Sequence, residues 1–232
     1  MELFRELLAR LGGRFAAELG IEVKLGPEER QKWFLAAILY GARISGKIAA
    51  RTYQVFASRG ITRPDGILAQ GWDNLVALLD AGGYVRYDFK TADKLLAVMR
   101  GLKEHYGGDL ERLAAGCRDY PELESRLRGL APGLGPVTVN IFLRELRGVW
   151  PLAEPPLSPL ALLAAAHLRL LDQALSPEAA LAALADAWEA RPVPGFDLAD
   201  LEAALVRLGR DYCRKPAGPP CPLGDRCGRV KV

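Results

Sequence analysis

Residues 130–146, LAPGLGPVTVNIFLREL, constrain the fold of this chain more than any other segment. A short Pro-Gly-Leu-Gly-Pro turn leads directly into a segment whose apolar residues recur at i, i+3, i+4 and i+7, and so share one face of a helix: Val139, Phe142, Leu143 and Leu146. Residues 121–130, before the turn, also predict a helix. We therefore expect two helices joined by a tight glycine turn.

The turn itself predicts an anion site. Gly133 and Gly135 permit positive φ and close backbone approach, and Pro136 suits the first turn of a helix, where its missing N–H costs nothing. The free amides at a helix start and the positive end of its dipole attract anions. Few side-chain donors lie nearby, so we expect the amides around Gly133, Leu134, Gly135 and Val137 to bind a backbone phosphate of nucleic acid.

The rest of the chain favours an all-α fold. Half of the residues are hydrophobic, Ala and Leu dominate, and no long stretch alternates apolar and polar residues as a strand would. Helices are expected at about 2–18, 27–41, 45–59, 72–81, 89–105, 108–115, 121–131, 136–147, 159–172, 176–190 and 197–212, with a turn at 62–66. There is no long uncharged apolar run and no signal peptide, so we expect a cytoplasmic protein without a membrane span, associated with the nucleoid if its nucleic-acid partner is DNA.

A proline-rich linker predicts two helical lobes. Residues 149–159, VWPLAEPPLSP, contain four prolines and cannot be helical. We expect one lobe at 27–148, which ends in the hairpin, and a second lobe formed by 1–26 together with 149–232. A ligand cleft between two such lobes is a common arrangement.

Three of the four cysteines lie near the C-terminus, Cys213, Cys221 and Cys227, spaced C-x7-C-x5-C in a segment too rich in Pro and Gly for regular structure. In a cytosolic protein, clustered thiols indicate metal ligands before disulfides. An iron–sulfur cluster needs four soft ligands, or three and one other; zinc needs four. Cys117 is the remote candidate for a fourth ligand. The alternative is a set of inert thiols in the tail.

Several motifs together resemble the helix-hairpin-helix DNA glycosylase superfamily, specifically its endonuclease III-like branch. The hairpin APGLGPVTVNIFL is similar to that family's L-P-G-[VI]-G-x-x-T-A pattern, residues 87–94 and 104–108 resemble its Y-x-x-K-A helix and that helix's end, and residues 208–227 resemble its cluster-bearing tail. The resemblance covers about residues 33–227. It implies a two-lobed helical fold, a monomer, and double-stranded DNA with a damaged or mismatched base as partner.

The resemblance implies a 4Fe–4S cluster, but the ligand set departs from the family's C-x6-C-x2-C-x5-C. The last interval is intact and the first cysteine is in place, whereas the second is missing and the loop is two residues shorter, with Gly218 or a neighbour at that point. The expected alternatives are a cluster held by three cysteines and an outside ligand, such as Cys117, or loss of the cluster. A cluster with a sensory role is a weaker possibility.

The residues at the catalytic positions also differ from those of the family. Bifunctional members carry a lysine nucleophile two residues after the second hairpin glycine, and that position is Val137, so a Schiff-base lyase is not expected. The family's aspartate past the linker aligns with Pro156 or Leu157. Glu154 is the one carboxylate of the linker and the candidate catalytic acid, or else an exposed loop residue. Lys47 is a second candidate, or else a solvated helix charge.

Two expectations concern the DNA itself. Arg43 matches the region that fills the gap left by a flipped base, and Tyr84 and Tyr87 are candidates for stacking on that base, although aromatic residues of this kind are often core. The expected function is a monofunctional DNA glycosylase that flips a base into the cleft between the lobes. The alternative is a catalytically inactive protein on the same scaffold that recognises distorted DNA.

Overall fold

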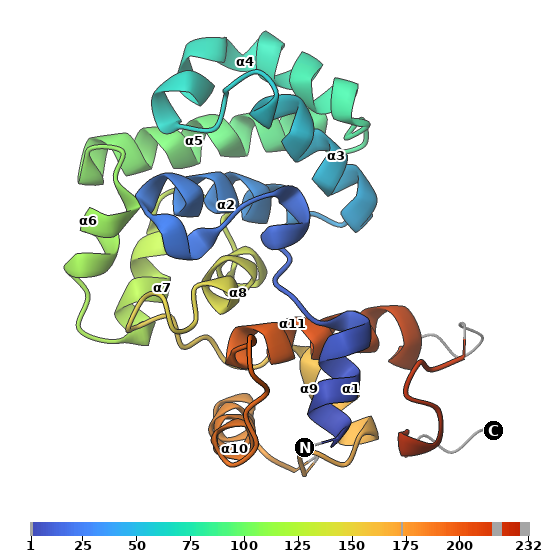
Figure 1. The fold of residues 1–232 in the computed structure, drawn as a ribbon. Helices are drawn as coiled ribbons and strands as arrows, with labels where there is room; N and C mark the ends of the chain where they lie inside the picture. Colours follow the sequence, from blue (N-terminus) through green and yellow to red (C-terminus); the bar gives the residue numbers. More distant parts are fainter. Residues whose placement is uncertain (1, 173, 215–219, 228–232) are drawn as a thin grey trace. The chain divides into compact units, whose positions relative to one another are not determined.

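The computed structural model describes residues 2–172, 174–214 and 220–227, and in these ranges every regular element is a helix (Figure 1). The expected all-α class is confirmed for this part of the chain. None of its helices is both long enough and apolar enough to cross a membrane.

The chain divides into two compact units. Unit 2 is the continuous segment Ala16–Glu154, and unit 1 combines Met1–Phe15 with Pro155–Val232. The sequence placed these boundaries at 26/27 and 148/149. Residues 16–26 belong to unit 2 because they are hydrogen-bonded into it: the Ala16 amide donates to Glu145 Oε2 at 3.0 Å, and Gln54 Nε2 donates to the Leu19 carbonyl at 3.3 Å.

Unit 2 holds the hairpin. Figure 1 shows α2 running between the α4–α5 pair and the α7–α8 hairpin. Its elements are η1 (Ala17–Leu19), η2 (Val23–Leu25), α2 (Pro27–Tyr40), α3 (Gly46–Ala57), α4 (Pro64–Gly82), α5 (Asp88–Tyr106), α6 (Leu110–Ala115), α7 (Tyr120–Gly129) and α8 (Pro136–Glu145).

In unit 1, α11 packs against α1 and α9. Arg207 on α11 donates to the carbonyls of Leu11 (2.9 Å) and Gly13 (2.6 Å), and its guanidinium lies 4.1 Å from the Phe15 ring centroid. These contacts satisfy carbonyl groups at and just after the C-terminal end of α1. The elements of this unit are α1 (Glu2–Leu11), α9 (Pro159–His167), α10 (Pro177–Glu189), α11 (Leu198–Leu208), the π-helical turn η3 (Gly209–Cys213) and η4 (Gly224–Arg226).

Helix α2 is the buried centre of unit 2. Residues 33–39, WFLAAIL, are apolar on every face and are all buried, as expected for a helix surrounded by others. One side chain and one backbone group of α2 anchor its neighbours: Trp33 Nε1 donates to the Phe142 carbonyl of α8 at 3.1 Å, and the Leu39 carbonyl accepts from the Tyr84 hydroxyl at 2.5 Å. Helix α2 therefore ties together α8 and the turn between α4 and α5.

Two predicted elements differ from the structure. Helix α4 begins at Pro64, inside the predicted turn at 62–66, because proline is well suited to a first helical position. Non-helical backbone at Gly71 (φ 69°, ψ 177°) divides α4 into two helical segments, and the second matches the predicted helix at 72–81. The predicted helix 2–18 ends at Leu11, since Gly13 takes a positive φ of 86°. Ser158 and Ser176 cap α9 and α10, because each hydroxyl accepts from the backbone amide three residues on.

The close contact between the hairpin and α5 predicts opposite effects on stability for alanine substitutions at two glycines. A Cβ at Gly101 would lie 2.2 Å from the Leu130 carbonyl oxygen, whereas a Cβ at Gly129 meets nothing within 4 Å. We expect Gly101→Ala to destabilise the protein by about 1–3 kcal/mol, since the backbone of α7 must move. Gly129→Ala should stabilise it by about 0.5–1 kcal/mol through its higher helix propensity. Urea unfolding of the two variants checks both signs; equal stabilities would contradict this close packing.

Candidate nucleic-acid interface

The predicted hairpin is present, with α7 and α8 joined by residues 130–135. Its expected buried face is confirmed, because Val139, Phe142, Leu143 and Leu146 are all buried. Gly133 takes a positive φ of 87°, whereas Gly135 is extended (φ −87°, ψ 171°) and precedes the first residue of α8. The turn therefore requires glycine conformation at Gly133 alone.

The start of α8 leaves backbone donors available. No side chain caps this helix. The first hydrogen bond of α8 runs from the Val139 amide to the Gly135 carbonyl, at 3.2 Å. The amides at the first positions of a helix have no intrahelical acceptor. Val137 is 65% exposed, so the surface around these amides is open to a ligand. An oxyanion is the ligand that such a helix start favours.

Close packing fixes the position of this helix start. A Cβ at Gly41, just after α2, would lie 2.0 Å from Thr138 Oγ1 on α8, so the end of α2 touches the first turn of α8 directly. The ring of Phe142 packs edge-on against Phe34 at 4.9 Å. Leu134, at the tip of the turn, is buried. The hairpin is thus held against α2 rather than projecting as a loose loop.

A basic pocket of about 560 Å³ lies beside the hairpin. Pro132 and Gly133 form one wall, residues 41–43 after α2 another, and the N-terminal half of α5 the third. Three cations line it, Arg43, Lys90 and Lys94, against one carboxylate, Asp93, which accepts from Trp72 Nε1 at 2.9 Å. In the part of the chain that the structure describes, these three cations have no carboxylate partner. Their charge is therefore available to an anionic ligand.

Lys94 is the most unusual of the three. Its Cε would lie 3.7 Å from a Cβ on Gly133, which places its amine against the hairpin turn. Burial lowers the pKa of the Lys94 amine below its ordinary value, because the half-buried ammonium has lost part of its hydration. The sequence analysis did not single out Lys94, and its helical position alone gives no sign of this environment.

The two aromatic candidates, Tyr84 and Tyr87, lie in different surroundings. Tyr84 is fully buried with its hydroxyl bonded to Leu39, so its ring belongs to the core of unit 2 and does not line the pocket. Tyr87 does line the pocket, and the Arg86 guanidinium lies 5.5 Å from its ring centroid. Phe89 is exposed and packs on Trp72 at 5.1 Å. An exposed aromatic and basic surface thus borders the pocket.

The two candidate catalytic side chains lie outside this pocket. Glu154, the last residue of unit 2, forms an ion pair with Arg147 at 2.7 Å, and its side chain is half exposed. Lys47 lies in the first turn of α3, exposed and with no charged partner among the described residues. Val137 occupies the surface at the start of α8 where the resemblance would place an amine.

The cysteines are all free thiols. Cys117, in unit 2, donates to the Leu113 carbonyl at 3.3 Å, as a helical cysteine commonly does. In unit 1, Cys221 and Cys227 are close enough for their thiols to hydrogen-bond, and burial, with that neighbour, raises the pKa of Cys221. Gly218 lies outside the described residues. Within the described ranges no three metal-ligating side chains converge, and the presence of a cluster stays a prediction.

Searches of the sequence against protein-family models and against curated proteins found no match. The site must therefore be interpreted from its own geometry.

The lowered pKa of Lys94 predicts that the free energy of unfolding depends on pH. Its folded-state pKa is lowered, so the unfolded chain binds the proton more tightly, and stability rises as pH increases from the folded pKa toward the unfolded value. We expect Lys94→Met to raise the unfolding free energy at pH 7.5 by up to about 1 kcal/mol, or roughly 2–4 °C in Tm. Lys90→Met, one turn earlier on the exposed surface, is the control and should change Tm little. A lower Tm for Lys94→Met would contradict the assigned cost of burial.

Proposed function

We propose that this chain binds double-stranded DNA through the hairpin and basic pocket of unit 2, and removes a damaged or mismatched base as a monofunctional DNA glycosylase. The observation that carries the DNA-binding part is the uncapped start of α8 beside three cations without carboxylate partners among the described residues. A phosphate bound at the helix start would accept from backbone amides and gain from the cations nearby. Such contacts position a duplex but carry no sequence information.

The exposed rings support contact with bases rather than with phosphates alone. Tyr87 lines the pocket, and the exposed Trp72 donates to the pocket residue Asp93 and packs on the exposed Phe89. Bases removed from the helical stack are held by aromatic side chains. An enzyme that acts on a base must extract it from the duplex in this manner. The damaged base itself is not specified by these residues.

The glycosylase step is assigned to Glu154 and a water molecule. Cleavage of an N-glycosidic bond develops positive charge on the sugar, which an ionised carboxylate stabilises, and the same carboxylate can accept the proton of the attacking water. The ion pair with Arg147 holds the Glu154 carboxylate in one orientation on the proline-rich linker. Water, not an amine, is the nucleophile in this proposal because Val137 cannot act as one.

A specific observation favours the second candidate, a non-enzymatic DNA-binding protein. The same Arg147 that orients Glu154 also neutralises much of its charge, and neither Glu154 nor Lys47 lines the basic pocket. Such a protein would keep salt-dependent binding to distorted DNA and release no base. The two candidates share the DNA-binding surface and differ only in turnover.

DNA binding is tested at Gly135, where a new side chain meets open space. We expect Gly135→Glu to fold normally and to weaken duplex binding at least 100-fold, about 2.7 kcal/mol, because its carboxylate would repel the phosphate. Gly135→Gln has the same shape without the charge and should lose much less. Fluorescence anisotropy at several salt concentrations gives both affinities. Equal affinities for the Glu and Gln variants would remove the hairpin from the interface.

Catalysis is tested at Glu154 with a panel of duplexes that each contain one altered or mismatched base. We expect the wild type to release at least one of these bases and Glu154→Gln to release it about 100-fold more slowly or worse, since an electrostatic stabiliser has been lost. Base release is measured by mass spectrometry under single-turnover conditions, with DNA affinity as the control. Binding without release from any duplex would favour the non-enzymatic protein.

A further inference from the structure

A second pocket lies at the other end of α2, away from the hairpin. It has a volume of about 320 Å³ and is enclosed by the first turns of α2, α4 and α6 and by the Gly107–Gly108 turn after α5. Gln31, which lines it, precedes Gly41 of the basic pocket by ten residues, a distance of about 15 Å along a helix. The two pockets are therefore separate sites on one unit.

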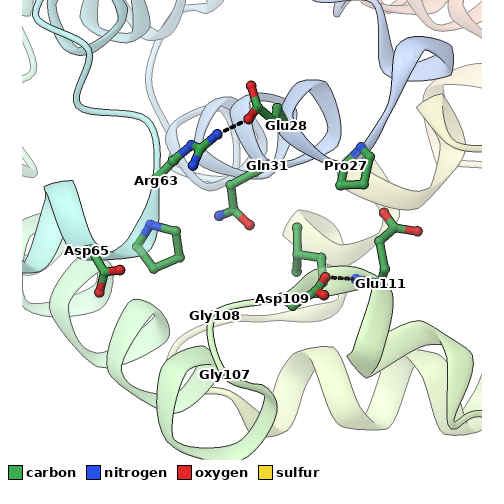
Figure 2. A pocket seen from close by; sticks show the side chains of 11 residues that line it. Pro27, Glu28, Gln31, Arg63, Asp65, Gly107, Gly108, Asp109 and Glu111 are labelled. Atoms are coloured by element: carbon green, nitrogen blue, oxygen red, sulfur yellow. Dashed lines mark hydrogen bonds and ion pairs between the residues drawn. The ribbon is translucent and has the colours of Figure 1, made fainter.

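Gln31 presents an unsatisfied donor to this pocket. Its side chain is 7% exposed, and its Nε2 has no hydrogen-bond partner. Figure 2 shows the amide pointing from α2 into the hollow between Arg63, Asp65 and Asp109. A buried polar group without a partner destabilises the fold, and methionine would fill the same space without that cost. A ligand that accepts from Nε2 would remove the penalty.

The other available groups are donors as well. Helices α2 and α4 both begin at the pocket with proline, and no side chain caps either start, so their first amides have no intrahelical acceptor. The short helix α6 is different, because Asp109 caps it by accepting from the Glu111 amide at 2.8 Å. Two of the three helix starts are thus open to an acceptor.

The four carboxylates of the pocket are already paired. Glu28 pairs with Arg63 and Asp65 with Lys103. Glu111 accepts from Arg30 Nε at 2.6 Å and from Trp150 Nε1 at 3.0 Å. Asp109, besides its capping role, lies 3.7 Å from Arg112. With each acid matched by a cation, the pocket neither needs a cationic ligand nor strongly repels a single negative charge.

We propose that this pocket binds a small molecule through its carboxylate group, with Gln31 Nε2 and the open start of α4 as the donors. A carboxylate supplies the acceptor oxygens that these groups lack. A dianionic phosphate would bring a second negative charge into a pocket whose four acids and four cations balance one another, and so would lack a counter-charge there. The apolar remainder of such a molecule would lie against Pro27, Pro64 and Leu110, and the volume suits a molecule of amino-acid size.

The test uses the whole protein, with acetate and propionate as carboxylate probes and inorganic phosphate as the competing anion. In ¹H–¹⁵N spectra at constant ionic strength, we expect saturable shifts of the Gln31 side-chain amide with either carboxylate, and none with phosphate. The Gln31 signal is identified by its loss in Gln31→Met. Absence of saturable shifts with both carboxylates would overturn the proposal, as would binding of phosphate alone.

A second measurement separates binding from a structural role. Without a probe, Gln31→Met should have a higher Tm than the wild type, because the unsatisfied buried donor is gone. With 100 mM acetate or propionate, the wild type should gain Tm relative to sodium chloride of equal ionic strength, and Gln31→Met should not. Gln70→Met, on α4 outside the pocket, should respond as the wild type does. A lower Tm for Gln31→Met, or an equal response to the carboxylates in both proteins, would contradict the site.

Discussion

Unit 2 is organised by the burial of α2, a helix that is apolar around its whole circumference. Such a helix must be covered on all sides, and α3, α6 and α8 pack against it. Its backbone and its one buried indole then fix the partners: Trp33 bonds to α8, and Leu39 receives the Tyr84 hydroxyl. Gly41 allows the end of α2 to touch Thr138. The place of the hairpin follows from this core.

The N-terminal turns of α2 are polar where the rest of the helix is not, and a pocket that retains a costly group lies at each end of the helix. At one end the Lys94 ammonium is half buried without a carboxylate among the described residues, and at the other Gln31 keeps a buried donor unsatisfied. Folding alone would favour methionine at either position. Proteins commonly accept such local instability where a ligand is to be bound. At Lys94 and Gln31, the residue that favours ligand binding is therefore not the residue that would make the fold most stable.

The features predictable from sequence were those set by local spacing. The apolar face of α8, the serine caps at Ser158 and Ser176 and the proline-rich linker each depend on residues a few positions apart. The start of α4 was missed because Pro64 signals a turn and a first helical position equally well. The basic pocket could be anticipated at Gly133, Arg43 and Tyr87. Lys94 and Gln31 acquire their properties from segments distant in sequence, which no local pattern records.

The division of the chain bears on the order in which it folds during synthesis. Unit 2 is one continuous segment, so all of its contacts become available once Glu154 has left the ribosome. Helix α1 is made first, yet its partners α9 and α11 come from the last third of the chain. At about 5–20 residues per second, the amphipathic α1 must wait roughly 10–40 seconds with its apolar face uncovered. Its acidic residues Glu2 and Glu6, later paired with Arg226, would help to keep the nascent segment hydrated during that interval.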